Sequence, residues 1–322
     1  MNFRKDVEPI DVENASHRIY ALCHVGHVRH ENQDFMGVFE RDDQLLFIVS
    51  DGMGGHHGGF EASRMAVAEL GRHFMECEER SPKSLLCQGI LNAHNALQGF
   101  AVENPEMEGM GATVVAAIIV ENRVWIAHLG DSRAHVLRGD DVRQLTIDHT
   151  AINSLALSGD LDPEALANHP YGHILDRSLG GEGGANTEIR EDVILLQAGD
   201  RLILSTDGYW QSASDEDVRR DLSISSLTEA VEAALSHALE CGGSDNITIG
   251  VLEARGGEET PLPADVREDF LSRAHERYRE NRIVPPPVRT DEEPRPRPRP
   301  HWRWGILFAV VLGGIIAFFM SN

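Results

Sequence analysis

Residues 45–56 read LLFIVSDGMGGH, an apolar run that ends abruptly at Asp51. A short, continuous apolar run of this kind is typical of a strand that is buried on both faces. The glycine that follows Asp51 has no side chain, so a backbone carbonyl group or an ion can approach the end of the strand closely. The stretch therefore predicts a central strand with a carboxylate at one end.

Two further apolar runs are also followed by an aspartate. Residues 124–129 (VWIAHL) precede Gly130 and Asp131, and residues 201–206 (RLILST) precede Asp207. An isolated aspartate of this kind is most often a turn former. Because a sheet brings the ends of its strands together, several of them in one chain instead predict a group of neighbouring carboxylates.

The connections between the apolar runs favour antiparallel sheets. Residues 113–120 (TVVAAIIV) and 124–129 are separated by three polar residues, which predicts a hairpin. Residues 193–196 and 201–205 flank an Ala-Gly-Asp turn and predict a second hairpin. Hairpins of this kind indicate strands that pair with their neighbours in the chain.

Helical periodicity occurs in three segments, residues 61–79, 84–102 and 226–239, and a Ser-Pro pair at residues 81–82 separates the first two. Strands joined by hairpins, with helices grouped apart from them, predict a layered α+β fold rather than a doubly wound parallel sheet.

Two other segments of the globular part have little periodicity. Residues 1–17 are predicted to be a polar lead-in. Residues 146–184 are rich in Gly, Asp, Asn, Pro and Ser and contain only short helical candidates, such as residues 163–167. We expect this second segment, called the excursion below, to be a mobile loop region beside the site.

The composition changes after residue 255, so we predict three parts. A globular domain occupies residues 1–255, a charged linker rich in proline and arginine occupies residues 256–303, and a transmembrane helix occupies residues 304–320. Within the linker, residues 264–282 predict an exposed helix, and residues 285–300 predict an extended polyproline spacer.

The predicted transmembrane helix contains 16 uncharged residues, GILFAVVLGGIIAFFM at 305–320. With Trp302 and Trp304 upstream, this run spans most of a hydrocarbon core of about 30 Å. The alternative is a buried helix of a soluble domain. Four arginines upstream of the run favour the membrane, and the positive-inside rule then predicts a single-pass protein of the cell membrane with its catalytic domain in the cytoplasm.

Charge and cysteine content exclude some classes of protein. The formal net charge is −23, with 52 acidic and 29 basic residues, which argues against a nucleic-acid binder. The four cysteines show no CxxC spacing, which favours a reducing compartment. The polar N-terminal residues do not resemble a secretory signal.

Aspartates at five predicted strand ends form the candidate site: Asp34, Asp51, Asp131, Asp207 and Asp245. Clustered carboxylates repel one another unless cations lie between them. Hard divalent ions with oxygen ligands, Mn²⁺ or Mg²⁺, suit such a cluster better than zinc does.

The chain contains seven motifs in a characteristic order: RxxNQD (29–34), DGMGGH (51–56), GAT (111–113), GDSR (130–133), LTxDH (145–149), STDG (205–208) and GGSDNIT (242–248). This series resembles the metal-dependent PPM, or type 2C, protein phosphatases in their bacterial form. The resemblance covers residues 19–253, nearly all of the globular part. It implies a four-layer sandwich, in which two antiparallel sheets lie between helix pairs.

The resemblance also implies a role for each site residue. Asp51 would bridge two metal ions, and the Gly52 carbonyl group would bind one of them. Asp207 would hold one ion and Asp245 the other, while Asp131 with Asp207 would form a third, weaker metal position. Asp34 would position metal-bound water, and Arg29 would bind the substrate phosphate, for which its bidentate guanidinium is suited.

The implied reaction is hydrolysis of phosphoserine and phosphothreonine in proteins, opposing a bacterial Hanks-type kinase. A water that bridges two ions would attack phosphorus, so no covalent phospho-enzyme is required. Two departures from the family pattern motivate an alternative, against which the complete set of carboxylates weighs. Gln33 replaces a glutamate of many members, and Met53 stands where eukaryotic members have a histidine. The alternative is a membrane-anchored module that binds phosphoproteins with weak or no catalysis.

Overall fold

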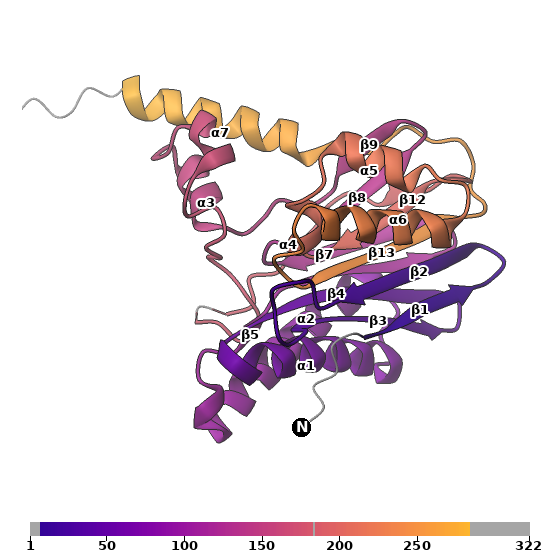
Figure 1. The fold of residues 1–322 in the computed structure, drawn as a ribbon, viewed down its shortest axis with the longest axis horizontal. Coiled ribbons are helices and arrows are strands. Elements are labelled where there is room, and N and C mark those ends of the chain that lie inside the picture. The colour runs from indigo at the N-terminus through magenta and orange to yellow at the C-terminus, as the bar shows by residue number, and fades with distance from the viewer. Residues whose placement is uncertain (1–6, 183, 284–322) are drawn as a thin grey trace, which may run out of the picture. The chain divides into compact units, whose positions relative to one another are not determined.

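The computed structural model describes residues 7–182 and 184–283 and consists of two antiparallel β-sheets with helices on their outer faces (Figure 1). The first sheet contains, in spatial order, β1 (Val7–Glu13), β2 (His17–His24), β13 (Ile247–Ala254), β12 (Arg201–Ser205), β8 (Arg133–Arg138) and β9 (Asp141–Gln144). The second contains β10 (Glu188–Ile189), β7 (Arg123–Leu129), β6 (Val114–Val120), β4 (Gln44–Met53) and β3 (Asp34–Arg41), with β11 (Ile194–Leu195) paired to β7 and β5 (Gly111–Ala112) paired to β4.

The helices fall into groups on the two outer faces and in the excursion. They are α1 (Gly55–Glu76), α2 (Pro82–Glu103), α3 (Ala151–Ser158), α4 (Asp207–Trp210), α5 (Asp215–Leu222), α6 (Leu227–Glu240) and α7 (Val266–Ile283), with short 3₁₀ turns η1 (Pro105–Met107) and η2 (Pro163–Asn168). Helices α1 and α2 pack on the second sheet, and α5 and α6 lie on the opposite side, over the first sheet (Figure 1). The predicted α+β class, with two antiparallel sheets and helices, is confirmed.

Strand β4 explains why the LLFIVS run is continuously apolar. Because side chains alternate along a strand, Leu45, Phe47 and Val49 face the core between the two sheets. Leu46 and Ile48 face the opposite way, into the core beneath α1 and α2. All five side chains are at most 2% exposed. The predicted strand is therefore buried on both faces, and Asp51 lies near its end.

One predicted hairpin is confirmed and the other is wrong. Strands β6 and β7 pair directly, with Glu121 at φ +55° in the tight turn between them. Strands β11 and β12 do not pair, because β11 joins β7 in the second sheet whereas β12 lies between β8 and β13 in the first. Between them the chain crosses from one sheet to the other, and Leu196 is buried in the core that separates the sheets.

The N-terminal segment is also more ordered than its polar sequence predicts. Residues 7–13 form β1, the edge strand of the first sheet, which pairs with β2. From Ile10 onward its residues are alternately half-buried and exposed, after an irregularity in the pairing between Val7 and Ile10. Val7 and Ile10 pack against the core between the sheets, so residues 1–17 are not simply a lead-in.

The C-terminal part begins with the predicted helix at residues 264–282, which is observed as α7. One face of this helix is buried, at Phe270 and Ala274, rather than fully exposed as predicted. A compact unit runs to Asn281, and a second unit begins at Arg282. In the described residues no helix is both long and apolar enough to span a bilayer. The predicted transmembrane segment, residues 304–320, lies outside the described part of the chain.

Candidate metal and phosphate site

A cleft of 1070 Å³ opens where the two sheets bring their aspartates together. Its lining includes Arg29, Asp51, Gly52, Asp131, Asp207 and Asp245. Asp51 and Asp131 come from β4 and the end of β7 in the second sheet. Asp207 and Asp245 come from the end of β12 and the start of β13 in the first. The carboxylates that the sequence placed at separate strand ends therefore share one cavity.

Asp34 lies beneath this cleft rather than on its wall. It stands opposite Asp51 in the antiparallel register of β3 and β4, and it is 1% exposed. The hydroxyl groups of Thr206 and Thr248 donate to its Oδ2, at 2.8 and 2.7 Å. Its Oδ1 is buried and has no hydrogen-bond partner. Asp34 is thus fixed in orientation, with one oxygen still available.

The electrostatics of the cluster favour a cation. Burial, followed by repulsion from neighbouring carboxylates, raises the pKa of Asp51 well above its usual range. Burial likewise raises the pKa of Asp34 to about 7 and the pKa of Asp207 to about 6, with the charge of Asp245 contributing to both. Asp207 Oδ1 is another buried oxygen without a hydrogen-bond partner. Carboxylate oxygens in this condition fit a hard divalent ion.

Gly52 cannot be replaced without moving the backbone. A Cβ atom at this position would collide with the carbonyl oxygen of Gly59, in the first helix. The Gly52 amide donates to the Gln33 carbonyl oxygen at 3.0 Å, which ties the end of β4 to the loop before β3. Gly52 therefore allows the end of β4 to pack closely against the start of α1.

Arg29 reaches into the cleft from the loop between β2 and β3. Its Nη2 donates to Asp245 Oδ2 at 2.7 Å, and its side chain is 53% exposed. The guanidinium therefore lies beside the carboxylates while remaining accessible to a ligand.

Asn246 fixes the loop that carries Arg29, although the sequence had assigned it no role. Its Nδ2 donates to the carbonyl oxygens of Val25 and Glu31, at 2.9 and 3.0 Å. Its Oδ1 accepts from the Gln33 amide at 2.8 Å. The only available signal was its place beside Asp245 in the GGSDNIT motif.

The backbone at Asp131 is held by an aromatic side chain that the sequence did not single out. Trp210 Nε1 donates to the Asp131 carbonyl oxygen at 3.0 Å. Arg133 stacks on the Trp210 ring, 3.4 Å from its centroid, and makes a bidentate pair with Asp148 at 2.7–2.8 Å. Gln211, next to the tryptophan, donates to Asp207 Oδ2 at 2.9 Å. The C-terminal end of α4 thus contacts the backbone of Asp131 and the carboxylate of Asp207.

Residues 23–29 (CHVGHVR) have the Cys-x5-Arg spacing of phosphatases that use a cysteine nucleophile. The structure excludes that role for Cys23. Its thiol is 4% exposed in the core between the sheets, and its Sγ accepts a hydrogen bond from Asn32 Nδ2 at 3.2 Å. Of Cys23 and Arg29, only Arg29 lines the cleft.

His128, His149 and Glu188 form a further cluster of metal-binding residue types. The hydrogen bonds of the two histidine rings already engage the nitrogen atoms that would face an ion, which argues against a metal site. His149 Nδ1 accepts from the Gly130 amide, so its protonated Nε2 donates to Glu188 Oε2 at 3.2 Å. His128 Nε2 donates to the Ile147 carbonyl oxygen at 2.8 Å. Burial lowers the pKa of His128 to about 4. We interpret this cluster as a structural link between β7 and the start of the excursion.

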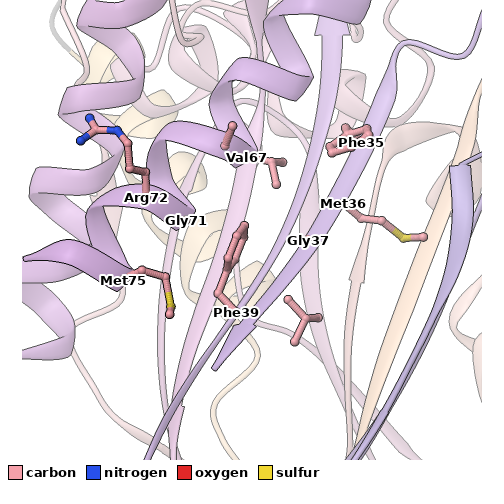
Figure 2. A pocket seen from close by; sticks show the side chains of 10 residues that line it. Phe35, Met36, Gly37, Phe39, Val67, Gly71, Arg72 and Met75 are labelled. Carbon is pink, nitrogen blue, oxygen red and sulfur yellow. The ribbon is translucent and has the colours of Figure 1, made fainter. Parts of the chain in front are cut away.

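An apolar pocket of 380 Å³ lies elsewhere, between β3 and α1 (Figure 2). Phe35, Phe39, Val67 and Met75 line it, and among the residues that line it Arg72 is the charged one. The Arg72 guanidinium is engaged by Glu69 and Glu76 on its own helix. The pocket therefore offers no group suited to phosphate chemistry.

Known proteins resemble the chain across this region. The sequence profile of protein phosphatase 2C matches residues 26–242. The serine/threonine phosphatase stp of Listeria innocua is 37% identical over 234 residues, which are 71% of this chain and 92% of that protein. The solved S. agalactiae serine/threonine phosphatase has a TM-score of 0.67 and 32% identity, covering 73% of this chain and 98% of its own.

A third relative is the catalytic domain of the phosphatase PstP, solved in complex with two manganese ions. It has a TM-score of 0.64 and 30% identity and covers 74% of this chain and 99% of its own. The profile match includes Arg29, Asp51, Asp131 and Asp207 from the cleft. The chain therefore belongs to the protein phosphatase 2C (PPM) family and is a bacterial-type protein serine/threonine phosphatase.

Proposed function

We propose that the cleft binds two Mn²⁺ or Mg²⁺ ions, with a third position beside Asp131, and hydrolyses phosphoserine and phosphothreonine in proteins. Asp51 would lie between the two ions, with Asp207 holding one and Asp245 the other. The Gly52 carbonyl group would complete the set from the floor of the cleft. The observation that carries this proposal is the gathering of carboxylates with raised pKa values and unpartnered buried oxygens around one cavity.

The chain's own residues would bind and orient the reactants. Bound divalent ions supply a Lewis acid, which polarises the phosphoryl group and lowers the pKa of water. Arg29 would donate two parallel hydrogen bonds to phosphoryl oxygens, exchanging its pairing with Asp245 for pairing with the substrate. Asp34, held by two threonine hydroxyls, would accept a hydrogen bond from the attacking water through its free Oδ1.

The biological setting is part of the same proposal. Phosphoproteins made by a serine/threonine kinase would be the substrates, because the relatives are named as serine/threonine phosphatases. Residues 304–320 would anchor the protein in the cell membrane, with the catalytic domain on the cytoplasmic side. The support for this anchor is its apolar composition and the arginines before it.

Phosphate release from a phosphothreonine peptide tests the catalytic proposal. Purified protein should be active with Mn²⁺ and inactive in EDTA. Asp207→Asn should lower kcat by about 100-fold or more, because it removes a charged ligand and so weakens the binding of the ions. The matched control is Asp141→Asn, an exposed aspartate on β9 that pairs only with Arg143 at the surface. Activity that survives EDTA, or an unaffected Asp207→Asn variant, would contradict the proposal.

The same assay separates the enzyme from the phosphoprotein-binding module. Such a module would retain phosphopeptide affinity with negligible turnover, on account of Gln33 and Met53. The complete set of cleft aspartates favours catalysis. Robust turnover by the purified protein would eliminate the alternative.

A further inference from the structure

Helix α7 lies beyond residues 26–242, which the family profile matches. It contacts both the phosphatase body, at β9 and α5, and the excursion. Its N-terminal end is fixed to the phosphatase body. The buried carboxylate of Asp265 accepts from the Gln144 amide of β9 at 3.3 Å. Arg267 makes a bidentate ion pair with Asp215 of α5, at 2.9 and 3.1 Å, and a second pair with Asp265.

The middle of α7 packs against the excursion. Phe270 and Ala274, one helical turn apart and hence on one face, are 5% and 0% exposed. They form a small core with Ala156 of α3, against which Ile147 and Leu166 also pack. Figure 1 shows α3 and α7 side by side. Most other side chains of α7 are charged and exposed, so the contact of Phe270 and Ala274 provides most of the apolar packing of this helix.

Further along, α7 contacts the end of α3. Asn281 Nδ2 donates to the Ser158 carbonyl oxygen at 2.9 Å. Gly159 ends α3 at φ +83°, and a Cβ atom there would lie 2.6 Å from the Arg277 carbonyl oxygen. His275 Nε2 lies 3.3 Å from Glu164 Oε1 of η2. The two backbones therefore approach closely at a position where only glycine fits.

The excursion in turn forms one wall of the catalytic cleft. The Ala151 amide, at the start of α3, donates to the Ile174 carbonyl oxygen at 2.8 Å, and Thr150 forms a β-bridge with Leu175. His173 and Leu175 line the cleft together with Arg29 and the aspartates. Packing thus runs without interruption from α7 through α3 to this wall.

A second pocket, of 680 Å³, lies between α7 and the excursion. Phe270 and Leu271 line it from α7, and Ile152 lines it from α3. His173 and Gln211 line both this pocket and the catalytic cleft, so the two cavities adjoin.

We propose that α7 is a specificity element, which positions the excursion as the wall against which a polypeptide substrate lies. A phosphorylated protein would place its phosphoryl group among the cleft aspartates and its flanking residues along the excursion. A small aryl phosphate would use only the cleft. Helix α7 therefore governs recognition of the polypeptide without touching the reacting atoms.

The test compares two substrates on the full-length chain with Mn²⁺. Phe270→Ala and Ala274→Asp disrupt the buried face of α7. For a phosphothreonine peptide, KM should rise by about 3- to 30-fold, the range expected when a packed contact couples to a distant site. For p-nitrophenyl phosphate, kcat/KM should stay within about twofold, because uniform binding in the cleft is unchanged. The control is Arg273→Ala, on the exposed side of the same helix, where Arg273 pairs only with Asp269.

Backbone hydrogen exchange supplies a readout independent of activity. Residues 151–176 should exchange faster in Phe270→Ala than in the wild type, while β4 and β13 remain protected. Should Ala274→Asp fail to fold, Asn281→Ala removes only the bond to Ser158 and should show the same substrate split to a smaller degree. Equal losses on both substrates, or unchanged peptide KM with unchanged exchange of the excursion, would overturn the proposal.

Discussion

Asp34 is the most deeply buried acid of the site, and burial raises its pKa to about 7. In the unfolded chain an aspartate has a pKa of about 3.9. Between these values the unfolded state releases its proton while the folded state keeps it. The folded state is therefore favoured at low pH, and that advantage is lost as the pH rises toward 7. Asp207, with a pKa raised to about 6, acts in the same direction.

We therefore predict that the metal-free protein loses stability as the pH rises from about 4 to about 7, the interval between the unfolded pKa of an aspartate and the raised pKa values in the folded state. Urea unfolding in EDTA at several pH values measures this directly. Asp34→Asn cannot ionise and should flatten the dependence, at the expense of activity. A free energy of unfolding that is constant or increases over this interval would show that folding does not raise the pKa values of these carboxylates.

Arg29 provides a second prediction at the level of one side chain. Arg29→Lys keeps the charge but loses the planar fork that matches phosphate. We expect kcat/KM for a phosphopeptide to fall by about 10- to 100-fold, the equivalent of one hydrogen bond to a charged group. Far-ultraviolet circular dichroism and Mn²⁺ affinity should remain those of the wild type. A similar loss in Mn²⁺ affinity would instead assign Arg29 to the metal site.

The sequence alone predicts site residues whose type and local position indicate their chemistry. An aspartate directly after an apolar strand indicates a carboxylate at a sheet edge. In the structure Asp51, Asp131, Asp207 and Asp245 line one cleft. Asn246 and Trp210 have no such local sign. Their function lies in hydrogen bonds to backbone groups of distant segments, such as that from Trp210 to Asp131, 79 residues away.

At the level of elements, the packing of the two sheets depends on one small residue. Gly250 of β13 lies against Phe47 of β4, and a Cβ atom at residue 250 would overlap the Phe47 ring. Gly250→Ala should destabilise the protein by about 1–3 kcal/mol, the usual effect of overpacking. The matched control, Gly99→Ala, lies in α2 with no atom within 4 Å of the added methyl group. It should stabilise the helix by up to about 1 kcal/mol. Thermal unfolding of both variants tests the pair, and equal shifts would contradict it.

Elements joined by a local turn were predictable, and those joined across the fold were not. The turn at residues 121–123 carries its own signal, whereas the turn at residues 198–200 is equally polar and yet joins two different sheets. Strand β1 was missed for a related reason. The pairing of β1 with β2 is irregular between Val7 and Ile10, and this irregularity breaks the alternation that would mark a strand in the sequence. The sheet that a strand joins is decided by long-range packing in the core, which the local sequence does not show.

The molecule as a whole yields a prediction about ligand binding. The cleft aspartates come from both sheets, so ions bound there would hold the sheets together. Saturation at 100 times the dissociation constant should stabilise the folded state by about 2.7 kcal/mol. The unfolding midpoint should therefore rise with Mn²⁺ concentration. Asp207→Asn should reduce this dependence, whereas Asp141→Asn should leave it intact.

The proposed anchor is also tested on the intact molecule. Removing residues 305–322 should transfer the protein from the membrane fraction to the soluble fraction. Activity on a soluble phosphopeptide should be retained, because the described fold through α7 is unaffected. An unchanged distribution after fractionation would refute the anchor.

The order of strands in the first sheet has a consequence for synthesis on the ribosome. Strand β2, made among the first 24 residues, pairs with β13, which is completed only at residue 254. Thr248 and Asp34, 214 residues apart, must likewise meet before Asp34 is oriented. Pairing across so large a separation forms late. We therefore expect the nascent chain to lack phosphatase activity until β13 has been made, and truncated products that end before β13 to be inactive.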